Sequence, residues 1–171
     1  MDSWQKRPNM KIAFFGSSIV SAYWNGAATY YRGIVKALHR MGHEVTFYEP
    51  DIYERQQHRD IEDPAYCKVV VYEKDEEILG NLLRQASEAD VIIKASGVGA
   101  FDDFLEREIA ALKKDDNLVI FWDVDAPATL DRLEKNPQDP FRELIPKYDL
   151  VLTYGGGQPV INAYDKNVAR R

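Results

Sequence analysis

The sequence holds a single cysteine, Cys67, and only three histidines among its 171 residues. One cysteine excludes an internal disulfide and is typical of a protein from a reducing compartment. The cysteine and the histidines are scattered along the chain, so they offer no spacing that would hold a zinc ion. We therefore predict no metal site and no cofactor.

Basic residues are scarce relative to acidic ones, because 22 Lys and Arg stand against 28 Asp and Glu, a net charge of -6. A protein that binds a phosphate backbone normally presents a basic face, so we exclude nucleic acid as a partner. No apolar run approaches the roughly 18 residues of a membrane span. The polar start MDSWQKRPN also lacks the apolar region of a signal peptide. We expect a cytoplasmic protein with no membrane span.

What the sequence does contain is a series of short, nearly continuous apolar runs that alternate with helical patterns. The predicted strands are residues 10–15, 44–49, 66–72, 90–96, 118–123 and 149–154. The predicted helical segments are residues 27–41, 75–88, 102–112, 128–134, 140–146 and 158–164. Strands of this kind are typical of a sheet that is covered on both faces. The pattern predicts a three-layer, doubly wound, mostly parallel α/β fold of the Rossmann-like type over residues 10–165, with tails at 1–9 and 166–171.

In such folds ligands bind outside the carboxyl ends of the strands, which directs attention to the loops at that edge. The first of them, residues 16–26, carries Ser17, Trp24, Asn25 and Gly26. Small polar residues before a helix can receive an anionic or hydroxyl-rich ligand, and sugars stack on indole rings. Two alternatives stay open: the glycines serve only the turn, or Trp24 packs under the loop. The loop has no G-x-G-x-x-G pattern, so a dinucleotide fingerprint is weak.

Two carboxylates follow the fifth predicted strand. Asp123 and Asp125 are two residues apart in an extended segment, so they point the same way and could bind a metal or act as a general base. The alternative is that Asp125 caps the helix that begins near Pro127, while Asp123 pairs with an arginine.

Three further features are weaker signals. The consecutive glycines Gly155, Gly156 and Gly157 permit close approach of a ligand, or form a flexible turn. The irregular segment around Tyr53, Arg55 and His58 could contact a ligand, but a solvated surface explains it better. We also expect the other two histidines, His39 and His43, to be solvated.

Four segments resemble a known family. The run LHRMGHEVTF at 38–47 is similar to the start of the second strand in GT-B glycosyltransferases. The other three segments are WNG with ATYYR at 24–32, FWDVDAPATL at 121–130, and DLVLTY at 149–154 with the glycines and the proline up to 159. Together they resemble the N-terminal half of the spore-maturation (CgeB-like) glycosyltransferases, from about Met10 to Tyr164.

This resemblance implies the acceptor-side domain of a GT-B enzyme that moves a sugar from a nucleotide-sugar donor to an unknown acceptor without a metal. The donor-binding C-terminal domain is absent from the sequence, so we expect no activity from this half alone. By resemblance, Asp125 or Asp123 would deprotonate the acceptor. The implied substrate-binding residues are Ser17, Trp24, Asn25, Gly26, Thr129, Gly155, Gly156 and Gly157.

Two other functions stay open. The chain could be a non-catalytic binding or partner module, and an exposed surface could let it form a homo-oligomer. It could instead be a nicotinamide-nucleotide-binding oxidoreductase domain, because Glu49 follows the second predicted strand at the position that contacts ribose in such domains.

Overall fold

The structure is a computed structural model that describes residues 9–169. Apart from Asn9, the tail expected at 1–9 lies outside the described residues. The tail expected at 166–171 begins inside the last helix, which continues to Ala169 because nothing in that stretch breaks it.

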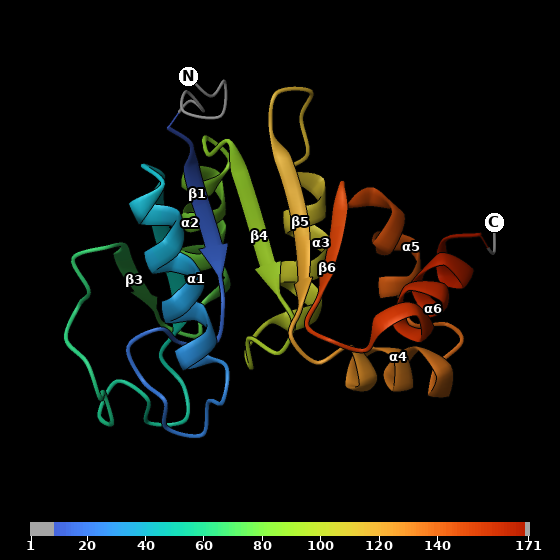
Figure 1. The fold of residues 1–171 in the computed structure, drawn as a ribbon, viewed down its shortest axis with the longest axis horizontal. Helices are drawn as coiled ribbons and strands as arrows, with labels where there is room; N and C mark the ends of the chain where they lie inside the picture. Colours follow the sequence, from blue (N-terminus) through green and yellow to red (C-terminus); the bar gives the residue numbers. More distant parts are fainter. Residues whose placement is uncertain (1–8, 170–171) are drawn as a thin grey trace, which may run out of the picture.

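Six strands form one parallel sheet in the order β3-β2-β1-β4-β5-β6 (Figure 1). They are β1 (Lys11–Phe15), β2 (Glu44–Pro50), β3 (Lys68–Tyr72), β4 (Val91–Ala95), β5 (Leu118–Asp123) and β6 (Leu150–Thr153). The direction of winding reverses between β1 and β4, which creates a crevice at the carboxyl ends of these two strands. The predicted three-layer, doubly wound parallel fold is therefore confirmed.

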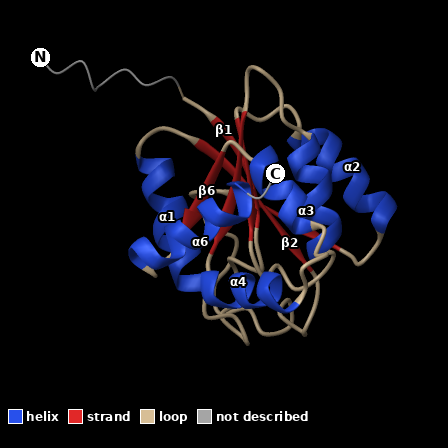
Figure 2. Ribbon diagram, turned by 90° about the vertical axis from the view of Figure 1, so that its right-hand side faces the viewer, coloured by secondary structure: helices blue, strands red, loops and turns tan. Residues whose placement is uncertain are grey.

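The helices cover both faces of this sheet. They are α1 (Ala28–Arg40), α2 (Glu76–Ala86), α3 (Asp102–Ala111), α4 (Ala126–Lys135), α5 (Phe141–Leu144) and α6 (Gly157–Ala169), with a short 3-10 turn η2 (Ile145–Lys147) after α5. Helix α1 packs on one face, and α2 and α3 pack on the other (Figure 2). Within the described residues, no helix combines the length and the apolar character that crossing a membrane requires.

Two apolar cores follow from the alternation of side chains along each strand. In β1, Phe14 points toward α1 and stacks on Phe47 with ring centroids 5.1 Å apart. Its neighbour Phe15 points to the opposite face and stacks on Tyr48 at 4.5 Å. Burial of both residues by neighbouring elements explains why β1 is apolar at every position but its first.

Asp102, where the predicted helical segment 102–112 starts, does not cap α3. The cap position is Phe101, in a left-handed conformation with φ of 57°, and Asp102 is the first helical residue. The Asp102 carboxylate instead accepts hydrogen bonds from the backbone N–H groups of Val98 and Gly99, at 3.0 and 2.8 Å. It also binds the ammonium of buried Lys94 at 2.6 Å. Asp102 thereby fixes the loop after β4, which forms one side of the crevice.

His43 is also placed differently from the prediction. It is buried beside β1, and its Nδ1 accepts a hydrogen bond from the backbone N–H of Met10 at 3.3 Å. His39 is exposed, as predicted. The difference arises because His43 follows Gly42, whose φ of 92° turns the chain back toward the sheet after α1.

Candidate functional site

The loops after β1 and β2 are joined by a dense set of hydrogen bonds at the carboxyl edge of the sheet. Buried Glu49, near the end of β2, accepts hydrogen bonds from the Ser18 hydroxyl at 2.8 Å and from the Ile19 N–H at 2.6 Å. The Gln56 side chain from the second loop donates to the same carboxylate at 2.7 Å. Glu49 is therefore the centre of the contact between the two loops.

A charged pair fastens the same loops on the outside. Arg32 of α1 donates from Nη1 and Nη2 to the two carboxylate oxygens of Asp60, each at 2.8 Å, and from Nε to the Ile19 carbonyl at 2.7 Å. Asp60 also accepts from the Ala22 N–H at 2.9 Å. The hydrogen bonds with Arg32 hold the pKa of Asp60 well below its usual range. The first loop is thus held in one conformation although it contains no helix or strand.

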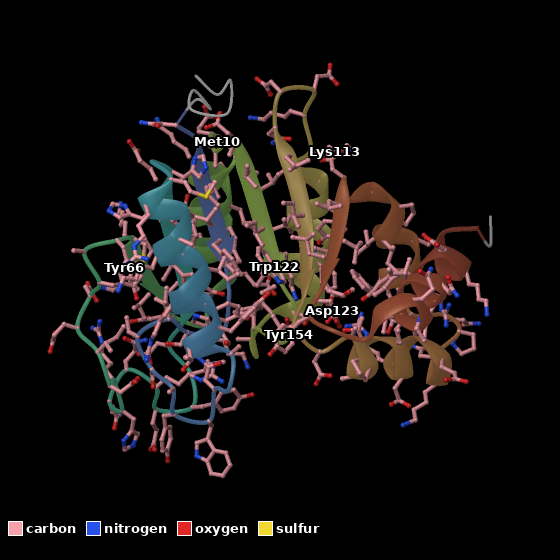
Figure 3. The ribbon with its side chains drawn as sticks, viewed as in Figure 1. Met10, Tyr66, Lys113, Trp122, Asp123 and Tyr154 are labelled. Carbon is pink, nitrogen blue, oxygen red and sulfur yellow. The ribbon has the colours of Figure 1, made fainter. Side chains whose placement is uncertain are left out.

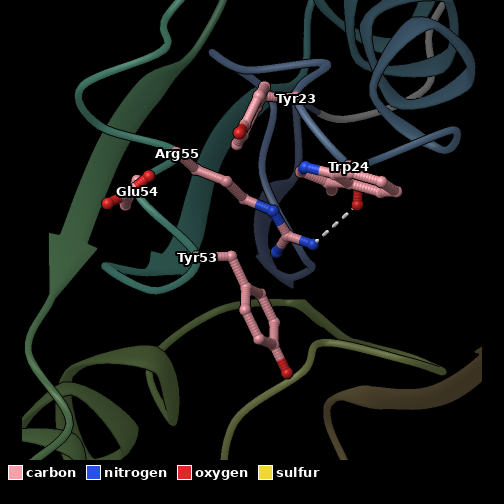
Figure 4. Close-up of a pocket in the computed structure, with 5 residues that line it drawn as sticks. All are labelled: Tyr23, Trp24, Tyr53, Glu54 and Arg55. Carbon is pink, nitrogen blue, oxygen red and sulfur yellow. Dashed lines mark hydrogen bonds between the residues drawn. The ribbon is translucent and has the colours of Figure 1, made fainter.

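A cavity of about 500 Å³ opens between these loops (Figure 4). Its lining comprises three aromatic side chains, one acid and one base: Tyr23, Trp24, Tyr53, Glu54 and Arg55. Trp24 is 82% exposed. Side chains of this size are costly to leave in water, and their rings offer flat surfaces for stacking.

The backbone of this cavity is strained. Trp24, Tyr53 and Glu54 have φ values of 47°, 54° and 57°. L residues with side chains seldom adopt this left-handed region, at a cost of about 1–3 kcal/mol each, and such residues cluster at binding sites. Three of the four such non-glycine residues in the described part of the chain line one cavity.

The loop after β4 also contacts a residue that lines the cavity. The Tyr53 hydroxyl donates to the Gly99 carbonyl at 3.4 Å. A Cβ on Gly99 would lie 2.9 Å from Ile52 Cδ1 and 3.1 Å from the Tyr53 ring, and the φ of Gly99 is 99°. Only glycine allows this close approach of the two loops. Because the loop after β4 contacts Tyr53, the cavity lies beside the crevice between β1 and β4, where this fold binds ligands.

Arg55 forms the buried wall of the cavity. Its side chain crosses between the rings of Tyr53 and Trp24 (Figure 4), with the guanidinium 5.1 Å from the Tyr53 ring centroid. Nη1 donates to the Ser17 carbonyl at 3.1 Å and Nη2 to the Trp24 carbonyl at 3.2 Å. Burial lowers the pKa of Arg55, but an arginine remains charged at neutral pH.

Of the ten predicted site residues, Trp24 alone lines this cavity. Ser17 and Asn25 are buried and hold the first loop together, since the Ser17 hydroxyl donates to Asn25 Oδ1 at 2.7 Å. The Asn25 amide donates to the carbonyls of Ser18 and Ser21 at 2.8 and 2.9 Å. Gly26 is exposed next to Asn25.

The predicted catalytic pair lies at the end of β5, near Trp122 and Tyr154 (Figure 3). Asp123 is fully buried and accepts hydrogen bonds from the Thr129 hydroxyl at 3.0 Å and the Tyr164 hydroxyl at 2.5 Å. The suggestion that Asp123 pairs with an arginine is therefore wrong. Asp125 accepts from the Ala128 N–H at 3.3 Å, which confirms that it caps α4.

The glycines Gly155, Gly156 and Gly157 are exposed at the start of α6, with φ values of 78°, 85° and 55°. They follow Tyr154, whose ring packs 4.9 Å from Tyr30 of α1. No cavity described here is lined by these glycines.

Sequence reasoning missed four of the five cavity residues: Tyr23, Tyr53, Glu54 and Arg55. For the segment around Tyr53 and Arg55 the sequence favours a solvated surface over contact with a ligand, and for Arg55, which is 5% exposed, the solvated surface is wrong. The usable signal was two tyrosines and an arginine in loops that follow adjacent buried strands. Burial of Arg55 depends on the carbonyls of a distant loop, which no local pattern predicts.

Two functions from the sequence analysis meet obstacles here. Every hydrogen bond of Glu49 goes to the loops, so its carboxylate is not presented to a ribose, and the nicotinamide alternative gains no support. Among residues 9–169, no group of three or more His, Cys, Asp and Glu side chains is arranged to hold a metal ion.

Comparison with known proteins yields little. No family model matches the sequence, and no curated protein matches it. The chain is similar to a solved structure, the C-terminal domain of the coenzyme A biosynthesis bifunctional protein CoaBC, at 14% identity and a TM-score of 0.45. The match covers 74% of this chain and 69% of that chain. This likeness indicates nothing about what the chain binds.

These findings correct the expected relationship to the CgeB-like GT-B glycosyltransferases, which is wrong. No family model matches, that of a glycosyltransferase included, and a solved structure to which the chain is similar is a domain of CoaBC. The segments that carried the resemblance have general structural duties: residues 38–47 end a helix at Gly42 and enter a buried strand. Residues 121–130 end β5 and cap α4 through Asp125. The implied donor, acceptor and missing donor domain lose their basis.

Proposed function

We propose that this chain is a binding domain for a small organic ligand that contains a planar or sugar ring. The observation that carries the proposal is the cavity formed by Tyr23, Trp24 and Tyr53 over Arg55. Its volume, about 500 Å³, is within the range of roughly 300–1,000 Å³ that is usual for small-molecule sites. It lies at the edge of the sheet where this fold class binds ligands.

The rigidity of the two loops supports this function. Buried Glu49 and the Arg32–Asp60 pair hold the loops that carry the aromatic rings, so little conformational entropy is lost when a ligand binds. The left-handed backbone at Trp24 and Tyr53 presents both rings to the cavity. A ring between them would bury apolar surface that is exposed in the free protein.

Titration calorimetry tests the proposal with four neutral ring compounds: nicotinamide, phenol, adenosine and glucose. We expect at least one to bind at millimolar concentration or below. The Trp24→Ala variant should weaken that binding about tenfold, since a stacking contact contributes about 1–3 kcal/mol. Tyr154→Ala is the matched control, because Tyr154 is an exposed aromatic residue outside the cavity. The proposal fails if no compound binds, or if the two variants behave alike.

A further inference from the structure

We propose that the cavity selects ligands in which an anionic group accompanies the ring, and that Arg55 receives this group. The inference rests on the proposed function and goes further, because it assigns the ligand a charge. It follows from the state of the Arg55 guanidinium in the free protein.

The positive charge of Arg55 is buried without an ion-pair contact among the described residues, and the buried carboxylate of Glu49 acts on it only through space. Arg55 is 5% exposed and forms an ion pair with none of the acidic side chains that the structure describes. Its neighbour Glu54 is turned away from the guanidinium (Figure 4), and its carboxylate lies 3.8 Å from the His58 ring nitrogen. Two carbonyl dipoles and a carboxylate that is not in contact do not replace an ion pair, and a buried cation that is only partly compensated is unfavourable. An anion in the cavity would compensate it.

The hydrogen-bonding capacity of Arg55 is also incompletely used. A guanidinium has five N–H groups, and Arg55 uses two of them, one from each terminal nitrogen, for the carbonyls of Ser17 and Trp24. Its Nε has no hydrogen-bond partner among the described residues. Each terminal nitrogen also carries a second N–H for which no hydrogen bond is seen among the described residues, and because Arg55 lines the cavity these groups could bind an acceptor there.

Phosphate and carboxylate oxygens are the acceptors that suit such donors. Both are planar or tetrahedral groups of oxygens that match the fork of a guanidinium and form charge-assisted hydrogen bonds with it. The chain as a whole carries an excess of negative charge, with 28 acidic against 22 basic residues, Arg55 included. Attraction of an anion to this cavity therefore depends on Arg55 itself rather than on a general positive field.

Paired ligands that differ in charge provide the test. Nicotinate and nicotinamide share one ring, as do phenyl phosphate and phenol, and in each pair the first is anionic. We expect the wild-type chain to bind at least one anionic member about tenfold more tightly than its neutral partner, which corresponds to about 1.4 kcal/mol. The pair with the larger ratio identifies the anion as carboxylate or phosphate.

The Arg55→Gln variant should bring this ratio to about one. Arg59→Gln is the matched control, since it removes one positive charge from the same loop but outside the cavity, where Arg59 pairs with Asp63. Arg55→Lys keeps the charge without the fork and should retain part of the ratio. A purely structural Arg55 would alter the stability of all complexes and leave the ratio unchanged.

The outcomes separate the two proposals. Absence of binding by both members of both pairs overturns this inference, and it overturns the proposed function as well if adenosine and glucose also fail to bind. Equal binding within each pair, or a ratio that survives Arg55→Gln, overturns the inference alone. If Arg55→Gln does not fold, nuclear magnetic resonance of the arginine Nε–H groups in the wild type decides. The signal that Arg55→Lys removes should shift with nicotinate or phenyl phosphate, and an unmoved signal contradicts the role of Arg55.

Discussion

At the scale of single residues, a polar side chain is defined by where its hydrogen bonds go. Asp123 and Glu49 are both fully buried and have their carboxylate oxygens bonded to neighbouring groups. Arg55 is also buried, at 5% exposure, but its Nε–H has no partner among the described residues. Satisfied buried groups stabilise the fold, whereas an unsatisfied one needs an explanation. We therefore expect a ligand to bind in the cavity beside Arg55 rather than at the end of β5.

Glycine at position 156 is a residue-scale requirement. Its φ is 85°, and an added Cβ would collide with the Val160 side chain. Gly156→Ala should therefore lower the free energy of unfolding by about 2 kcal/mol, as measured by urea denaturation. The control is Gly80→Ala inside α2, where no atom lies within 4 Å of the added Cβ. This variant should be more stable by about 0.5–1 kcal/mol. Equal effects of both variants would contradict the steric argument.

At the scale of elements, an aspartate stands at the start of three helices, but its side chain does not have the same role in all of them. Asp75 and Asp125 cap α2 and α4 by accepting backbone N–H bonds in the first turn. Asp102 stands within the first turn of α3, and its carboxylate bonds backward to the loop after β4. The sequence pattern is similar in all three, so the role of each depends on the loop that precedes it.

The capping role of Asp125 can be measured. Asp125→Ala should lower the free energy of unfolding by about 1 kcal/mol, because the Ala128 N–H loses its acceptor. Asp116→Ala, which removes an exposed carboxylate from the loop before β5, should change it by less than about 0.5 kcal/mol. Equal destabilisation by the two substitutions in thermal unfolding would show that capping is not what Asp125 contributes.

At the scale of the whole molecule, the site is assembled from three loops that follow β1, β2 and β4. Helix α1 joins this assembly through Arg32, which binds Asp60 in the second loop and the Ile19 carbonyl in the first. Charges on the opposite face fix the remaining loop, because buried Lys94 binds Asp102. Glu106, which is also buried, binds Arg132, and Arg132 binds Asp139. The loops around the cavity are thus fixed by side chains from both faces of the sheet.

The Arg32–Asp60 pair makes stability depend on pH. The pKa of Asp60 is lowered in the folded state by the hydrogen bonds with Arg32. The ionised Asp60 carboxylate therefore stabilises the folded state above the unfolded pKa of about 3.9, and this stabilisation is lost as pH falls below that value toward the lower folded pKa. Asp60→Asn should lower the melting temperature at pH 7, and this difference should narrow at pH 3. The effect is below about 1 kcal/mol because Asp60 is half-exposed. Thermal unfolding followed by circular dichroism at both pH values tests this prediction, with Asp116→Asn as the control. A difference in melting temperature between Asp60→Asn and the wild type that is the same at both pH values contradicts it.

The sequence by itself determined the sheet and its edge. Apolar runs such as 118–123 predicted the strands closely, since a buried parallel strand needs apolar residues on both faces. The parallel arrangement then indicated the edge at which a ligand would bind, and Trp24 was selected there from the residues alone. Capping of α4 by Asp125 was also predictable, because a cap is a contact within one turn.

Only the tertiary structure decided which side chains at that edge are available. Asp123 is occupied by Thr129 and by Tyr164, which lies 41 residues away, and Arg55 is buried by carbonyls 38 and 31 residues away. Such contacts depend on how loops from separate strands fold over one another. Local periodicity reports which face of a strand or helix is apolar, but it contains no information about the partner of a polar side chain in a distant loop.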